Sequence, residues 1–285
     1  MTDLSTVEHG FSSQSPLPIA DASGGRQEKP HSDGPGNQHL AGRVALVAGG
    51  SGPVGKAVAG MLAAAGASVA VHYRSSAVAA EAIVAGLGTP AMTVSADFAV
   101  AAEVDAAFDA IEAEFGPVDV LVNASHASLP PTAFADLTDD QLTSQLDSVR
   151  GHAYLCRRAL PGMRAAGWGR IVYVSGALMS RPAPGFAAYG AAKAAATTLT
   201  KYIALENGDA GITANVVAPG RVIDPDDDTP LTPTMAALAA RLRERMALDF
   251  PDAGEVAGVI GLLVGPGSAP LTGQTLWVTG GEPIA

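Results

Sequence analysis

Residues Ala48 to Ala57 read Ala-Gly-Gly-Ser-Gly-Pro-Val-Gly-Lys-Ala, and this stretch indicates how the chain folds. It follows a short β-rich run, Arg43–Ala48, and leads into Val54–Ala65, where the apolar residues have helical spacing. A strand, a glycine turn and a helix start form an anion site, because backbone N–H groups point at one place and glycine lets a phosphate approach. The stretch therefore predicts a phosphate-binding turn in an α/β fold.

Two other interpretations of this turn remain open. Gly50 to Lys56 also fits most of the P-loop of nucleotide triphosphatases. The next residue is Ala57, which lacks the hydroxyl that would hold magnesium, so this reading is disfavoured. A turn that merely packs tightly and binds no ligand is the other alternative.

Outward from the turn, β-rich runs alternate with segments of helical spacing. Strands are predicted at 68–72, 91–95, 118–122, 170–175, 212–217 and 275–278, and helices at 78–87, 102–115, 139–163 and 186–206. Apolar strands separated by helices are typical of a parallel sheet covered on both faces. The fold class is thus predicted as a doubly wound α/β domain over residues 41–285. Residues 1–40 are polar, rich in Gly and Pro, without a period, and are predicted to be a disordered tail.

Composition excludes several classes of function. A net charge of -11 without a cluster of Lys and Arg disfavours nucleic-acid binding. The single cysteine, Cys156, rules out an internal disulfide and a Cys-rich zinc site, and the six histidines show no ligand spacing, so no metal is expected. No signal peptide and no apolar run of about 20 residues is visible, so we expect a cytoplasmic protein without a membrane span.

The end of the second predicted strand reads His72-Tyr73-Arg74-Ser75. A site for NAD places an acidic residue there, for the 2′-hydroxyl of the ribose. Arg74 instead has the charge and the forked donors to hold a 2′-phosphate, which favours NADPH. An arginine that is simply solvated at the surface is the alternative.

Tyr189 and Lys193 are four residues apart on a predicted helix, so their side chains share one face. An ammonium near a phenol is expected to lower the pKa of the tyrosine. Such a tyrosine can donate a proton to a carbonyl oxygen while hydride reaches the carbon. Alone the pair is weak evidence, because such spacings are common.

Several short motifs follow one another along the chain. They are Gly49 and Gly55, Asp97-Phe98, 119–123 (Asp-Val-Leu-Val-Asn), 169–172 (Gly-Arg-Ile-Val), Tyr189 with Lys193, 219–222 (Pro-Gly-Arg-Val), 271–274 (Leu-Thr-Gly-Gln) and Gly280-Gly281. By these motifs in this order, residues 42–281 resemble the classical short-chain dehydrogenases/reductases. The resemblance implies the strand order 3-2-1-4-5-6-7 and a helix-mediated homodimer or homotetramer. It also implies a mobile substrate lid around 223–250.

The resemblance also implies roles for individual residues. Asp97 would hold the adenine amine, Lys193 the nicotinamide ribose, and the backbone of Val222 the carboxamide. The catalytic set would be Tyr189, Lys193, Ser175 and Ser148. The cofactor-binding set would be Gly49, Ser51, Pro53, Val54, Gly55, Arg74, Ser75, Asp97, Phe98, Asn123, Ala124, Ser125, Tyr189, Lys193, Pro219, Gly220 and Val222.

Four positions depart from the family pattern. Pro53 replaces the middle glycine of the turn, and residues 123–126 read Asn-Ala-Ser-His where Asn-Asn-Ala-Gly is usual. Ser148 occupies the position of the helix asparagine that organises a proton-relay water in the family. The catalytic serine is expected thirteen residues before the tyrosine, where this chain has Gly176. Ser175 is adjacent, but neighbouring side chains on a strand point to opposite faces.

Three explanations for Gly176 stay open. A bulge turns Ser175 inward, another donor replaces the serine (Ser180, Ser125, His126 or a substrate group), or the site is weakly active or inactive. Since Tyr189 and Lys193 are both present, a working but atypical site is favoured. His126 follows the fourth strand, at the edge where ligands bind, although a solvent-exposed loop histidine is the simpler reading. His152 and Cys156 are expected to be packing residues.

The sequence therefore predicts an NADPH-dependent ketoreductase acting on a small carbonyl substrate such as a polyketide, a cyclic ketone, an acyl thioester or an imine. The alternative is an NADP(H)-binding sensor or scaffold subunit without turnover. Oxidation of an alcohol with NADP⁺ differs only in direction.

Overall fold

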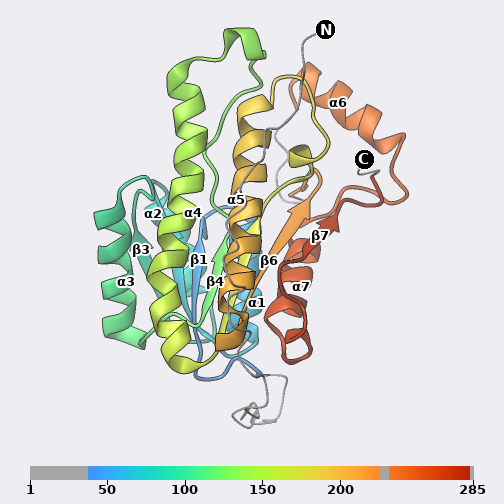
Figure 1. Cartoon of the computed structure of the whole chain (residues 1–285). Coiled ribbons are helices and arrows are strands. Elements are labelled where there is room, and N and C mark those ends of the chain that lie inside the picture. Colours follow the sequence, from blue (N-terminus) through green and yellow to red (C-terminus); the bar gives the residue numbers. More distant parts are fainter. Residues whose placement is uncertain (1–37, 225–230, 283–285) are drawn as a thin grey trace, which may run out of the picture. The chain divides into compact units, whose positions relative to one another are not determined.

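The computed structural model describes residues 38–224 and 231–282, and in them seven parallel strands form one sheet in the order β3-β2-β1-β4-β5-β6-β7 (Figure 1). This confirms the predicted fold class and strand order. Residues 1–37 of the predicted tail (1–40) and residues 225–230 of the predicted lid lie outside the described residues. The strands are β1 Val44–Ala48, β2 Ser68–Tyr73, β3 Ala91–Ser95, β4 Val120–Asn123, β5 Gly169–Val174, β6 Ile212–Pro219 and β7 Thr275–Val278.

Helices cover both faces of the sheet, which is why the central strands β1, β4, β5 and β6 are buried along their whole length. One face is covered by α3, α4 and α5, which stand in front of the sheet in Figure 1, and the other by α1, α2 and α7. The helices are α1 Pro53–Ala64, α2 Ala77–Ala85, α3 Ala101–Phe115, α4 Asp139–Ala166, α5 Ala187–Asn207, α6 Pro233–Arg243 and α7 Ala253–Val264.

Several element boundaries differ by a few residues from the sequence-based prediction, and two of these differences have a clear physical reason. Leu40 was assigned to the tail, but it is 1% exposed and its N–H donates to the carbonyl of Ala65, so the folded part begins before residue 41. Helix α4 continues past Met163 to Ala166. It ends there because Gly167 takes the left-handed conformation, with φ 63°, that closes helix C-termini.

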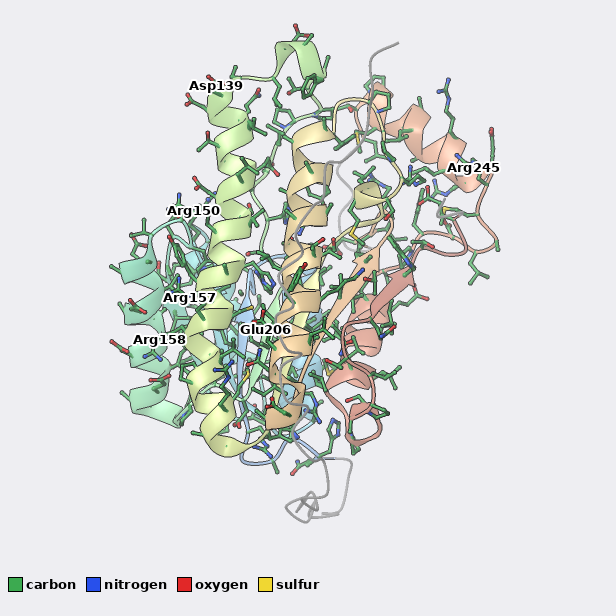
Figure 2. All side chains as sticks on the ribbon, viewed as in Figure 1. Asp139, Arg150, Arg157, Arg158, Glu206 and Arg245 are labelled. Atoms are coloured by element: carbon green, nitrogen blue, oxygen red, sulfur yellow. The ribbon has the colours of Figure 1, made fainter. Side chains whose placement is uncertain are left out.

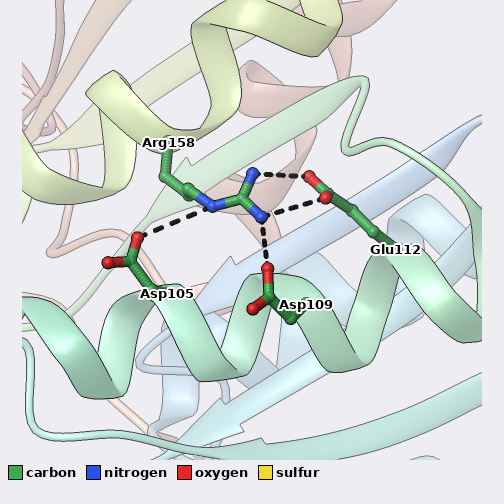
Figure 3. Close-up of polar contacts among 4 residues, drawn as sticks. All are labelled: Asp105, Asp109, Glu112 and Arg158. Carbon is green, nitrogen blue, oxygen red and sulfur yellow. Dashed lines mark hydrogen bonds and ion pairs between the residues drawn. The ribbon is translucent and has the colours of Figure 1, made fainter.

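A four-residue ion cluster joins α3 to α4 on the front of the sheet (Figure 3). The guanidinium of Arg158 on α4 binds both carboxylate oxygens of Glu112, at 2.8 and 3.0 Å. It also contacts Asp109 at 2.5 Å and Asp105 at 3.6 Å, all three acids being on α3. The hydrogen bonds to Glu112 and Asp109 raise the pKa of Arg158, and the cluster connects the two helices.

The order of the strands determines where a ligand can bind. Strands β1 to β3 extend in chain order toward one edge of the sheet, and strands β4 to β7 extend toward the other edge. Because the direction reverses between β1 and β4, a crevice opens between the carboxyl ends of these two strands. The glycine turn follows β1, and α6 lies above the same end of the sheet in Figure 1. Among the described helices, none combines the length and apolar character needed to cross a membrane.

Candidate active site

The glycine turn is built so that two of its residues must lack a side chain. Gly49 has φ 76°, and a Cβ there would lie 2.7 Å from the backbone nitrogen of Ser125. A Cβ on Gly55 would overlap the carbonyl oxygen of Gly49. Helix α1 starts at Pro53, directly after Gly52, and Pro53 lines the crevice wall without closing it. The turn thus brings the start of α1 close to β4 with room for a ligand.

Two adjoining cavities run along the carboxyl edge of the sheet and share Gly49, Gly52, Ala124 and His126. The first, about 460 Å³, is also lined by Ser51, Arg74, Ser75, Asp97, Phe98, Ser125 and Ser148. The second, about 600 Å³, is also lined by Pro53, Val54, Gly55, Ser175, Tyr189, Lys193, Pro219, Gly220 and Val222. The structure therefore places every sequence-predicted site residue except Asn123 on a wall of these cavities. Ser148 lies in the first cavity and not beside Tyr189.

A third cavity of about 400 Å³ opens on Tyr189 from the other side. Its wall is mostly apolar, with Leu129, Ala177, Leu178, Phe186, Met235, Leu238, Ala239 and Leu242. Arg181 in this wall forms an ion pair with Glu282, whose side chain is 1% exposed. Arg221 and His126 line the third cavity as well as the second. Tyr189 thus lines both the second cavity, which includes charged side chains, and the mostly apolar third cavity.

Tyr189 and Lys193 lie on α5, and Lys193 Nζ is 5.7 Å from the centre of the Tyr189 ring. The ammonium donates a hydrogen bond to the carbonyl of Val174, at 2.8 Å, and burial lowers the pKa of Lys193 to about 7. Burial raises the pKa of Tyr189 to about 12. The expected net lowering of the Tyr189 pKa is therefore not found, because burial of the phenol outweighs the stabilisation that the nearby ammonium gives to the phenolate. The phenol keeps its proton at neutral pH.

Ser175 and Gly176 point to opposite sides, as strand alternation predicts. The Ser175 hydroxyl accepts a hydrogen bond from Thr197 at 3.0 Å and faces the Met179 sulfur at 3.1 Å. Gly176 is extended, and a Cβ on it would lie 2.9 Å from the Tyr189 hydroxyl. No bulge turns Ser175 inward, since its N–H continues the regular ladder to Val217. The position beside the phenol is thus held by a glycine.

A buried hydrogen-bond chain fixes the loop after β4. The Asn123 side-chain oxygen accepts from the N–H of Ser125 at 3.0 Å and from its hydroxyl at 2.6 Å. The Asn123 amide donates to His152 Nδ1 at 3.2 Å, and His152 Nε2 donates to Thr200 at 3.0 Å, because the Thr200 hydroxyl itself donates to Ala196. His152 was expected only to pack. It is buried as expected, but it also orients Asn123 under the crevice.

His72 is a site residue whose contacts were not foreseen from the sequence. Its Nδ1 accepts a hydrogen bond from the N–H of Gly49 at 3.0 Å, and its Nε2 faces the carbonyl of Ala96 at 2.9 Å. The ring stacks on Phe98 with 3.9 Å between centres. One signal was available: His72 is an imidazole in a strand that otherwise reads as buried and apolar. A buried imidazole needs partners at both nitrogens.

Two of the residues proposed to replace the missing serine as hydrogen-bond donor, Ser180 and Ser125, are poorly placed for that role. Ser180 is exposed and lines none of the three cavities, and the Ser125 hydroxyl is committed to Asn123. The histidines, cysteine and acidic residues in 38–224 and 231–282 form no group of three that could hold a metal ion.

Comparison with known proteins places these features in one family. The family model described as Enoyl-(Acyl carrier protein) reductase matches residues 48–282. A chloroplastic NADPH-dependent aldehyde reductase-like protein of Arabidopsis thaliana is 34% identical over 85% of this chain and 94% of its own length. The 3-oxoacyl-[acyl-carrier-protein] reductase FabG of Staphylococcus aureus is 32% identical over 84% of this chain and 97% of its own.

Solved structures agree with the sequence relatives. A short-chain dehydrogenase from Burkholderia cenocepacia in complex with NADP superposes with a TM-score of 0.76 and 35% identity, over 85% of this chain and 98% of the other. A short-chain dehydrogenase/reductase from Serratia marcescens reaches a TM-score of 0.78 at 32% identity over the same shares. The likeness extends over nearly the whole length of each relative.

Proposed function

The chain belongs to the short-chain dehydrogenase/reductase family, and from this premise we propose that it reduces the carbonyl group of a small organic ketone to an alcohol with NADPH. It is an NAD(P)H-dependent oxidoreductase acting on C=O and CH–OH groups. The observation that carries the proposal is the place of Tyr189. Its protonated phenol lies where the nucleotide crevice meets an apolar chamber.

The residues of the crevice fit NADP(H). The turn at Gly49 and Gly55 leaves no space for side chains but lets a diphosphate approach the start of α1. Arg74 is exposed at the far end of the first cavity and makes no ion pair with another described residue, which leaves its guanidinium free for a 2′-phosphate. Asp97 and Phe98 stand beside it for the adenine, and Lys193, Pro219 and Val222 line the nicotinamide end. When bound, NADPH supplies the hydride.

The chain's own residues then supply the proton and the electrostatics. The Tyr189 hydroxyl donates its proton to the carbonyl oxygen. The Lys193 ammonium stabilises the negative charge left on the phenol, and the low dielectric of the buried site strengthens this attraction. The apolar walls from α6 and from 177–186 exclude water from the reacting carbonyl.

The size and lining of the third cavity favour a mainly apolar ketone. Ketones of the polyketide type, cyclic ketones and acyl thioesters are the substrate classes to test. NADPH oxidation is followed with such a panel, in parallel for the wild type and Tyr189→Phe. We expect turnover with at least one ketone and a loss of at least a hundredfold in Tyr189→Phe. Equal turnover in the two proteins would contradict the role of Tyr189.

One observation favours a second function, an NADP(H)-binding subunit without turnover. Gly176 leaves the position beside the Tyr189 hydroxyl without a polar side chain. That function predicts tight NADPH binding together with no NADPH consumption on any carbonyl of the panel. Binding titration and turnover measured on one preparation separate the two functions.

We also propose that the protein forms a homodimer or homotetramer through α4 and α5. These helices lie side by side in Figure 1 and expose Leu142, Leu146, Leu199, Tyr202 and Leu205. Figure 2 labels the charged residues Arg150 and Arg157 on α4 and Glu206 on α5. Leu205 is 81% exposed, and exposed apolar side chains on two adjoining helices favour an interface with another protein surface. Light scattering should give a multiple of 28.5 kDa, and Leu205→Glu should lower that mass.

A further inference from the structure

The proposed site has a gap in its hydrogen-bond donors. A carbonyl that accepts hydride develops negative charge on its oxygen, and preorganised donors aimed at that oxygen lower the barrier. Tyr189 provides one donor. The position next to its hydroxyl belongs to Gly176, and the Ser175 hydroxyl faces Thr197 and Met179 instead. A second donor, if the site has one, comes from another wall of the cavities.

Most polar side chains of the second and third cavities are already committed. Arg181 is paired with Glu282, and Arg243 with Asp249 at 3.0 Å. The Lys193 ammonium donates to a backbone carbonyl at 2.8 Å. The buried ion pair of Arg181 and the buried hydrogen bond of Lys193 are costly to break, so these two groups are poor candidates for reaching a substrate oxygen. The Arg243–Asp249 pair is exposed and weaker, but Arg243 lines the second cavity only.

His126 is the polar residue that lines all three cavities. Gly176 and Tyr189 accompany it in the second and third. Arg221 shares those two but comes from the loop after β6, and Ser128 lines the third alone. His126 is therefore the side chain at the junction of the nucleotide crevice, the phenol and the apolar chamber.

Two further contacts suit His126 to the task. Its loop is anchored by Asn123, whose amide is oriented by the buried His152, so the base of the loop is fixed. His126 is exposed at the cavity walls, as the simpler reading of the sequence expected, yet desolvation by the surrounding atoms and the nearby charge of Lys193 lower its pKa. The imidazole is consequently neutral at neutral pH and carries one N–H, which is a donor that does not need to lose its proton.

We infer that His126 is a catalytic residue, and that its imidazole N–H donates a hydrogen bond to the substrate carbonyl oxygen in place of a side chain at position 176. The inference rests on the proposed ketone reduction. Hydride from NADPH, which is oxidised, forms the new C–H bond. The π electrons of the C=O bond move to oxygen, which takes the proton of Tyr189. His126 keeps its own proton throughout.

The first test compares His126→Phe, which keeps a flat ring without a donor, with His126→Gln, which keeps an N–H donor. We expect His126→Phe to lower kcat for the ketone by about 10²–10³, the usual effect of removing one such donor, with the NADPH dissociation constant within about twofold of wild type. His126→Gln should recover at least tenfold of that loss. A loss confined to NADPH affinity would overturn the inference and make His126 a cofactor contact.

The second test places a hydroxyl at the glycine. Gly176→Ser puts its Cβ 2.9 Å from the Tyr189 hydroxyl, so the phenol must shift slightly to admit it, in both backgrounds alike. If His126 replaces the hydrogen-bond donor that is missing at position 176, a serine there should help most when His126 is absent. The fold-change in kcat caused by Gly176→Ser should then be at least ten times more favourable in the His126→Phe background than in the wild-type background. Equal fold-changes in both backgrounds would overturn the inference, because independent groups give additive effects.

The outcomes separate this inference from the proposed function. Activity that depends on Tyr189 but survives His126→Phe within threefold overturns the role of His126 alone, and then Arg221→Met identifies the competing donor. A wild type that consumes no NADPH with any ketone overturns both. Circular dichroism and thermal unfolding of each variant check that a loss of activity is not a loss of fold.

Discussion

The backbone N–H of Gly49 donates a hydrogen bond to Nδ1 of His72 across 3.0 Å. The other ring nitrogen, Nε2, is 2.9 Å from the carbonyl oxygen of Ala96, so the ring is neutral with its proton on Nε2. One side chain of β2 thus connects the turn after β1 with the end of β3. Both segments line the first cavity, which makes His72 a positioning residue for the proposed NADPH site.

Replacing His72 by Phe should weaken NADPH binding more than it slows the reaction. Phenylalanine keeps the stack on Phe98 but leaves the Gly49 N–H without an acceptor, at a cost of about 1–3 kcal/mol. We expect KM for NADPH to rise about tenfold while kcat changes by less than threefold, measured by initial rates. His72→Asn, whose side-chain oxygen can take the place of Nδ1, should restore part of the affinity. Equal losses in kcat and affinity would instead indicate general disruption.

Two buried histidines should make the protein less stable in mild acid. Burial lowers the pKa of His72 to about 4 and that of His152 to about 3. Between these values and the ordinary histidine pKa of 6.5, the unfolded chain binds protons that the folded chain does not bind. The free energy of unfolding therefore falls as pH falls. Each histidine should contribute about 2 kcal/mol to the decrease between pH 7 and pH 5, measured by urea unfolding.

A variant without one of these groups isolates its contribution. In His72→Asn the decrease between pH 7 and pH 5 should be smaller by about 2 kcal/mol, since one titrating ring is gone. An unchanged decrease would mean that His72 is not the group that resists protonation.

His72 and Tyr189 illustrate which features of the site could be predicted from the sequence and which could not. The glycine turn and the placing of Tyr189 with Lys193 follow from periodicity and motif spacing, which are local, whereas the strand order was implied by the family resemblance. The alternation of side chains also gave the opposite facing of Ser175 and Gly176. The tyrosine pKa and the partners of His72 depend on burial and on contacts between distant segments, which no spacing records. The sequence suggested His126 because it follows a predicted strand. That His126 lines all three cavities can be seen only in the folded structure.

The pH dependence of the proposed reaction should report Lys193. Burial lowers the pKa of its ammonium to about 7, so the positive charge is present below pH 7 and lost above it. Because the charged form stabilises the deprotonated phenol, kcat/KM for NADPH in the reduction should fall as pH rises through about 7. Lys193→Arg, whose charge persists to much higher pH, should be less active but without this inflection. A kcat/KM that does not change between pH 6 and pH 8 in the wild type would contradict this role of Lys193.

Arg74 should set the preference for NADPH over NADH. It is exposed at the end of the first cavity, and a forked contact to a 2′-phosphate contributes about 1.5–3 kcal/mol. In Arg74→Ala we expect KM for NADPH to rise about 10–100-fold and KM for NADH to stay within about threefold, from initial rates with each cofactor. Arg157→Ala is the matched control, since this exposed arginine lies on α4 outside the three cavities. A parallel rise for both cofactors would assign Arg74 to a shared part of the nucleotide.

The cluster around Arg158 should stabilise the fold without affecting catalysis. Exposed ion pairs contribute little singly, but Arg158 binds Glu112 through two hydrogen bonds and also neutralises Asp105 and Asp109 on the same helix (Figure 3). In Arg158→Ala three carboxylates of α3 are left facing one another. The free energy of unfolding should fall by about 1 kcal/mol, and high salt should reduce the difference by screening that repulsion.

The neighbouring arginine provides the control for this effect. Arg157 carries the same charge on the same helix and takes part in none of these ion pairs, so Arg157→Ala should leave the unfolding free energy within about 0.5 kcal/mol of wild type. Urea unfolding of both variants in low and high salt makes the comparison. Equal destabilisation by the two substitutions would mean that the loss comes from net charge, and that the cluster does not hold α3 against α4.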